Sequence, residues 1–172
     1  MGRFLAVLAL CLWGLGLAQM RLESPAFGWG SPIPVRYTCD GANLSPPLIF
    51  AGVPLNAASL ALVLFDPDAP GGIFYHWIVY DLVPGRRGLP EGVPGRPRLP
   101  GLLQGINDFG RPGYGGPCPP RGDRPHRYFF RLYAIRSPSL GLPPGAPARR
   151  VLTRLERMHV LAGAEWMGVY AR

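Results

Sequence analysis

Proline and glycine interrupt this chain throughout its length and limit what it can fold into. There are 22 prolines and 24 glycines among 172 residues, roughly twice the usual combined share. Few windows of ten residues lack a helix breaker, which excludes long helices, and the absence of a G-x-y period excludes collagen. Disorder is disfavoured because 48% of the residues are hydrophobic and only 16% are charged. The composition therefore predicts one compact domain of short strands and ordered loops.

The first residues have the pattern of a targeting segment. A positive start at Arg3 is followed by an apolar run over residues 4–17 and by small residues at Gly16 and Ala18. The run is shorter than the ~20 residues of a membrane-spanning helix, so we expect residues 1–18 to be a secretory signal peptide, with an uncleaved anchor as the alternative. The remaining domain, residues 19–172, would have no transmembrane segment and would be periplasmic or extracellular.

Two cysteines, Cys39 and Cys118, remain after this cleavage. An even number of cysteines in an oxidising compartment predicts a disulfide. Two free buried thiols are the alternative. A metal-binding pair is disfavoured, because neither cysteine has a C-x-x-C partner.

The charge balance favours anionic partners. All 18 basic residues are arginines, and the net charge is +8. Such a chain attracts phosphates, acidic lipid or nucleic acid. The arginines are scattered along the sequence, and no basic helix or zinc-finger spacing is present. We therefore expect no nucleic-acid partner.

Hydrophobic patterns predict a mainly β domain. Apolar runs rich in β-branched and aromatic residues predict three strong strands at 60–65, 76–82 and 128–135. Weaker patterns add candidate strands at 33–38, 102–104 and 164–171.

A single helix is predicted near the C-terminus, over residues 148–162. Val151, Leu155, Met158 and Ala162 would form one apolar stripe on it, and Gly163 would end it.

Polar side chains lie where the strong strands meet loops. Asp66 and Asp68 follow the first strand, His76 opens the second, and His126 and Tyr128 open the third. Because strand ends that converge at one edge of a sheet build a pocket, we expect these side chains to meet. Taken singly, each also has a structural interpretation, since aspartate is common in turns and histidine at strand ends.

Taken together, these segments resemble the phosphatidylethanolamine-binding protein (PEBP) family, most closely its bacterial, Raf-kinase-inhibitor-like (YbhB/YbcL) branch. The resemblance covers about residues 22–171. It implies a large antiparallel β-sheet core with small flanking elements and a C-terminal helix. The residues that carry it are Tyr37-Thr38-Cys39-Asp40-Gly41, Leu44-Ser45-Pro46-Pro47, Asp66-Pro67-Asp68-Ala69-Pro70, His76-Trp77, Gly113-Tyr114-Gly115-Gly116-Pro117-Cys118-Pro119-Pro120 and His126-Arg127-Tyr128.

The resemblance also implies a small pocket for phosphate-like anions and phospholipid head groups, with no cofactor. Cys118 would lie in the pocket wall, and a disulfide to Cys39 would fix that wall to the first turn. Carried over by position, the ligand-binding residues are Asp66, Asp68, Pro70, His76, Tyr114, Gly116, Cys118, Pro120, His126 and Tyr128.

Two carboxylates beside an anion need an explanation. We expect them to raise the pKa of His76 and His126, so that both rings act as charged donors. The function implied is a secreted binding protein that takes a small anion or head group and modulates a protein partner such as a protease. The alternatives are a hydrolase and a metal-dependent enzyme that use the same Asp and His residues. A binding protein is favoured over an enzyme because the chain has no G-x-S-x-G nucleophile motif.

Overall fold

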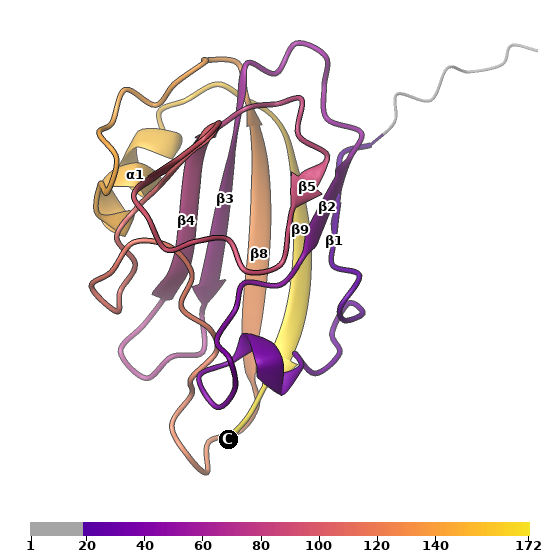
Figure 1. Cartoon of the computed structure of the whole chain (residues 1–172), viewed down its shortest axis with the longest axis vertical. Coiled ribbons are helices and arrows are strands. Elements are labelled where there is room, and N and C mark those ends of the chain that lie inside the picture. The colour runs from indigo at the N-terminus through magenta and orange to yellow at the C-terminus, as the bar shows by residue number, and fades with distance from the viewer. Residues whose placement is uncertain (1–18) are drawn as a thin grey trace, which may run out of the picture.

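The computed structural model describes residues 19–172, and the signal peptide expected at 1–18 lies outside the described residues. Figure 1 shows long strands flanked by loops and short helical segments. The elements in chain order are β1 (Arg21–Glu23), the 3-10 helix η1 (Val35–Tyr37), β2 (Leu48–Ala51), β3 (Ser59–Asp66), β4 (Phe74–Leu82), β5 (Gly88–Leu89), β6 (Arg98–Leu99), β7 (Leu102–Gln104), β8 (His126–Ile135), α1 (Ala148–Leu155) and β9 (Val160–Tyr170).

The strands form two antiparallel sheets. The large sheet has the order β6-β7-β4-β3-β8-β9, and the small sheet has the order β1-β2-β5. The predicted fold class is therefore confirmed: a large antiparallel sheet with small flanking elements and a C-terminal helix. No helix within residues 19–172 is both long and apolar enough to cross a membrane.

The large sheet separates two apolar cores because side chains alternate across a strand. On the inner face, Leu62, Trp77 and Phe130 pack in the core that also contains the small sheet. On the outer face, Val63 and Ile78 pack beneath α1. The strands β3, β4 and β8 are thus buried on both sides, which explains their continuous apolar runs.

The register of these strands brings the predicted polar residues to one end of the sheet. Strand β3 ends at Asp66, which faces Phe74 at the start of β4. On the other side of β3, Phe65 faces Phe129 near the start of β8. Because both neighbours run antiparallel to β3, their first residues lie beside its last one.

The prediction of a strand over residues 33–38 is wrong. Residues 35–37 form η1, and only an isolated bridge joins Pro32 to Val169. Pro32 and Pro34 lack the N–H groups that a strand would donate, and Pro34 instead caps the 3-10 turn.

The helix is shorter than predicted. It ends at Leu155, and Val151 and Leu155 are its buried apolar residues. The segment from Val160 onward pairs with β8 along the whole length of that strand, so Ala162 and Gly163 belong to β9. Tertiary pairing overrides the helical spacing here.

Candidate functional site

A small cavity lies where β3, β4 and β8 meet at one end of the large sheet. It has a volume of about 210 Å³ and contains three buried polar side chains, those of Asp66, His76 and His126. The remaining walls are aromatic, proline and sulfur groups from the adjoining loops. The lining residues are Asp66, Ala69, Pro70, Phe74, His76, Phe109, Cys118, Pro119, Pro120 and His126.

Asp66 organises the polar part of this cavity. Its carboxylate is 3% exposed and accepts two hydrogen bonds, one from His126 Nδ1 at 2.8 Å and one from the Asp68 backbone N–H at 2.8 Å. The bond to Nδ1 orients the His126 ring, so that Nε2 is the nitrogen available to a ligand. Asp123 Oδ2 lies 3.4 Å from this Nε2 atom of His126.

The second histidine of the cavity, His76, lies in an aromatic environment. Its Nδ1 donates to the Gly115 carbonyl at 2.7 Å, because a carbonyl oxygen can only accept. Its ring makes edge contacts with Phe74, Phe109 and Tyr128, with centroid separations of 5.0 to 5.3 Å.

The pKa of His76 is lowered, which contradicts the expectation that neighbouring carboxylates raise it. Burial disfavours the charged ring more strongly than the Gly115 carbonyl and Asp66 favour it. The Asp66 carboxylate is bonded to His126 rather than to His76, so its effect on His76 acts only through space. The cavity therefore holds a neutral His76 at neutral pH.

Tyr128 lies against the His76 ring, outside the cavity lining. Its side chain is fully buried, and its hydroxyl has no hydrogen-bond partner among the described residues. The pKa of Tyr128 is strongly raised, first by burial and then by the charge of Asp66. The phenol is therefore a neutral, unpartnered donor beside the polar end of the cavity.

The structure brings six of the ten predicted ligand-binding residues to the cavity wall: Asp66, Pro70, His76, Cys118, Pro120 and His126. The other four lie outside the lining. Asp68 is bonded to Arg127, with two contacts of 2.8 Å between their side chains. Tyr128 is the buried neighbour described above.

Tyr114 and Gly116 support the wall from behind. The Tyr114 hydroxyl donates to the Tyr37 carbonyl at 2.7 Å, and the Gly116 N–H donates to Asn43 Oδ1 at 2.8 Å. A Cβ at Gly116 would lie 2.3 Å from the Tyr37 carbonyl oxygen, so only glycine fits there. Both residues therefore fix the 113–118 segment against the first turn.

The predicted disulfide between Cys39 and Cys118 is present. The Cys39 N–H also donates to the Pro117 carbonyl at 3.1 Å. These two links join the first turn to the wall that contains Pro119 and Pro120, as expected from the resemblance.

Four lining residues were missed by the sequence reasoning: Ala69, Phe74, Phe109 and Pro119. Phe74 lies two residues before His76 on the same strand, and this spacing places both side chains on one face. Phe109 comes from the loop between β7 and β8, where no periodicity marks it. Arg111 lies over its ring at 5.7 Å.

The donor set lacks the number of ligands that a metal centre needs. Asp68 is committed to Arg127, and the Asp66 carboxylate accepts from His126 and from the Asp68 N–H. Within residues 19–172, no group of three or more His, Cys, Asp or Glu side chains is arranged to hold an ion.

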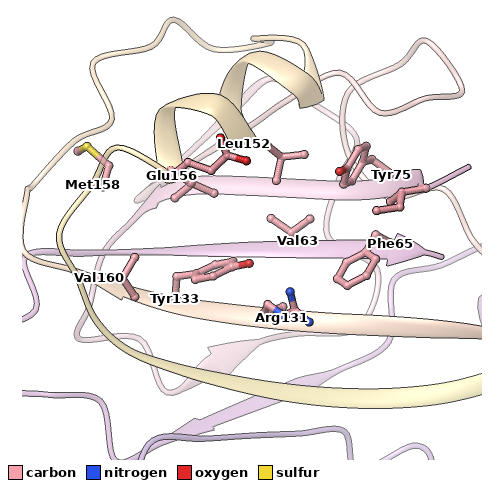
Figure 2. Close-up of a pocket in the computed structure, with 11 residues that line it drawn as sticks. Val63, Phe65, Tyr75, Arg131, Tyr133, Leu152, Glu156, Met158 and Val160 are labelled. Carbon is pink, nitrogen blue, oxygen red and sulfur yellow. The ribbon is translucent and has the colours of Figure 1, made fainter.

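A larger cavity of about 340 Å³ lies on the outer face of the sheet, beneath α1 (Figure 2). Its walls are mostly aliphatic and aromatic, as at Val63 and Tyr133. The one cation in its lining, Arg131, is paired with Glu165 at 2.7 Å and lies 5.0 Å above the Phe65 ring. This lining offers apolar contacts, whereas the buried acid and both buried histidines lie at the smaller cavity. The candidate site is therefore the smaller cavity.

The lowered pKa of His76 makes stability depend on pH. Above the unfolded value of 6.5, the ring is neutral in both states; below it, the unfolded chain binds a proton that the folded chain resists. We expect the free energy of unfolding to fall as pH drops below about 6.5. Urea unfolding at several pH values measures this slope. This slope should be less steep in the His76→Gln variant. It should be unchanged in His159→Gln, which alters an exposed histidine. Equal slopes in the wild type and His76→Gln would contradict the prediction.

Comparison with known proteins identifies the same architecture. The family model described as phosphatidylethanolamine-binding protein matches residues 23–171. A UPF0098 protein of Aquifex aeolicus is 48% identical over 161 residues, covering 94% of each chain. A UPF0098 protein of Methanothermobacter thermautotrophicus is 51% identical over 154 residues, covering 89% of this chain and 99% of the relative.

Two solved structures share the fold. E. coli YbcL, described as a member of the mammalian PEBP family, has a TM-score of 0.83 at 33% identity and is covered over 99% of its length, against 90% of this chain. The PEBP homolog CT736 of Chlamydia trachomatis has a TM-score of 0.79 at 40% identity, with coverage of 98% and 90%. With the family model matching nearly the whole described chain, this protein belongs to the phosphatidylethanolamine-binding protein family.

Proposed function

We propose that the cavity at the ends of β3, β4 and β8 binds the polar head group of a phospholipid or a similarly small phosphate compound. The observation that carries this proposal is the convergence of two buried histidines and a buried aspartate on one small cavity with aromatic and proline walls. Its volume of about 210 Å³ suits a head group rather than a whole lipid.

The two kinds of wall suit the two charges of an ethanolamine phosphate. The phosphate would accept a hydrogen bond from His76 once that ring is protonated, and it would lie beside Nε2 of His126. The ammonium group would lie against the Asp66 carboxylate and the face of Phe74 or Phe109. Prolines on the opposite wall lose little freedom when a ligand binds, which favours a preformed site.

We expect glycerophosphoethanolamine to bind more tightly near pH 5.5 than near pH 8, because acidification favours the charged His76 ring. The pKa of His76 is lowered, so its ring is neutral at the higher pH and becomes a charged donor only as the solution is acidified below the usual histidine range. A phosphodiester is the right probe, since a phosphomonoester itself changes charge near pH 6. Isothermal titration calorimetry measures both affinities, and equal affinities would contradict the proposal.

Matched histidine variants locate the site. His126→Asn retains a donor for Asp66 but removes Nε2, so we expect about a tenfold loss of affinity. His159→Asn alters an exposed histidine remote from the cavity lining and should bind as the wild type does. Thermal unfolding of both variants checks that the loss is not a loss of fold.

A binding role is favoured over hydrolysis by the state of the cysteines. Both Cys39 and Cys118 are joined in the disulfide, so neither supplies a thiolate nucleophile. The same bond supports export, because disulfides persist in oxidising compartments. N-terminal sequencing of the exported protein tests this part of the proposal, with Gln19 expected as the first residue.

A further inference from the structure

Four arginines gather in a groove along α1 and the turn that follows it. They are Arg149, Arg150, Arg154 and Arg157, and all four are exposed. The groove has a volume of about 490 Å³, and Thr153 adds a hydroxyl to its lining. The arginines look scattered in the sequence, whereas the structure concentrates these four and places no acidic residue among the lining residues. We refer to this feature as the arginine groove.

The spacing of the arginines places like charges side by side. Arg150, Arg154 and Arg157 lie at positions i, i+4 and i+7, so they project from one face of the helical turns. Within residues 19–172, none of the four arginines of the groove forms an ion pair with an acidic side chain. Elsewhere, the partly covered Arg131 is neutralised by Glu165. The arginine groove thus concentrates positive charge without a counter-charge.

This arrangement does not serve the helix itself. Arg149 and Arg150 occupy the first turn, where the positive end of the helix dipole disfavours cations, and no acidic residue is present in that turn. Neighbouring like charges at i and i+4 are also unfavourable. An anionic ligand would remove both penalties at once.

Arg154 is held in place for such a ligand. Its Nε donates to the Leu140 carbonyl at 2.8 Å, which anchors the guanidinium at the edge of the groove. A guanidinium has five N–H donors, so the terminal groups remain available for phosphate oxygens. Arginine is well suited to this role because its planar fork matches phosphate geometry.

We propose that the arginine groove binds a soluble molecule with at least two adjacent phosphate groups. Several guanidiniums side by side match several phosphates better than they match a single anion. The groove is open to solvent, and its volume of about 490 Å³ is enough for a small polyphosphate. None of its lining residues belongs to the head-group cavity, so this site and the proposed function succeed or fail separately.

Calorimetric titration with inorganic tripolyphosphate tests the proposal. The wild type should bind it, and the triple variant R150Q/R154Q/R157Q should bind it at least about tenfold more weakly. The control R21Q/R87Q/R96Q removes the same number of charges from exposed positions outside the groove, and it should retain affinity within about threefold. The groove variant should keep its affinity for glycerophosphoethanolamine.

Three results would overturn the proposal. They are no binding of tripolyphosphate by the wild type, an equal loss in both triple variants, and binding of phosphatidylglycerol vesicles that the groove variant weakens more than it weakens binding of tripolyphosphate. Thermal unfolding verifies the fold: the groove variant loses the Arg154–Leu140 hydrogen bond but also the repulsion between the arginines, so its stability should be close to that of the control. If the triple variant unfolds, Arg150→Gln alone, at an exposed position, should still weaken binding measurably; wild-type affinity in that variant would also count against the proposal.

Discussion

Replacing Asp66 with alanine is expected to lower the free energy of unfolding by about 3–5 kcal/mol. The carboxylate is buried and accepts from both His126 Nδ1 and the Asp68 N–H, so its removal leaves two buried donors without a partner. The Tyr128 hydroxyl in the same region already has no hydrogen-bond partner among the described residues. Urea unfolding, extrapolated to water, measures the change.

Asp68→Ala is the matched control for this prediction. Asp68 lies two residues away; its side chain is only 7% exposed, but its partner Arg127 has a half-exposed side chain. Loss of Asp68 should cost about 1–2 kcal/mol, because the arginine left without a partner can still be solvated. Asp66→Asn keeps one acceptor oxygen and should fall between the two. If Asp66→Ala were no more destabilising than Asp68→Ala, the role given to Asp66 as the organiser of the site would be wrong.

Loss of the Cys39–Cys118 disulfide is expected to cost about 4 kcal/mol, in the Cys39→Ser/Cys118→Ser variant or on reduction. The bond closes a segment of 79 residues, so it restricts the unfolded chain strongly. Thermal unfolding with and without a reductant measures the effect. The reductant should lower the midpoint of the wild type and leave that of the double variant unchanged.

The Cys39→Ser/Cys118→Ser variant should also bind its ligand differently. Cys118 lines the cavity beside Pro119 and Pro120. Without the disulfide this part of the wall is no longer fixed to the first turn, so glycerophosphoethanolamine binding should also weaken. A conservative Ser59→Ala variant, which loses one buried hydrogen bond to Ser137, controls for a general loss of stability. Weaker binding in both variants would point to global loosening rather than to the wall.

The central strands are predictable from the sequence because burial on both faces demands unbroken apolar runs. Trp77, Val79 and Phe130 occupy such runs and are fully buried. The short strands β1 and β2 are not predictable in the same way. Each has only three or four residues, and only their pairing with each other marks Leu22 and Phe50 as core residues.

The errors have a common cause. Pro32 and Pro34 prevent the 33–38 segment from pairing as a strand, although its apolar alternation fits one. After Leu155, the helical spacing of apolar residues continues to Ala162, but the residues from Val160 onward pair with β8 instead. In both cases backbone hydrogen bonding, which side-chain patterns do not reveal, decides the outcome.

The polar part of the candidate site is predictable because Asp66, His76 and His126 mark strand ends. The apolar part is less so. Phe109 reaches the cavity from a loop whose path depends on Asn107, which binds the Gly113 carbonyl and the Phe109 N–H. The electrostatic prediction for His76 fails because the sequence shows which charges are near but not how completely a ring is removed from water.

The order of the strands along the chain also sets when the protein can finish folding. Strand β3 waits for β8, and the link from Asp66 to His126 spans 60 residues. Strand β8 in turn pairs with β9, and Ile33, near the start of the domain, donates to Val169 near its end. Such non-local pairing folds slowly, since long loops must close before contacts form. We therefore expect the large sheet to be completed only after β9 has been synthesised, although β3 and β4 can pair earlier.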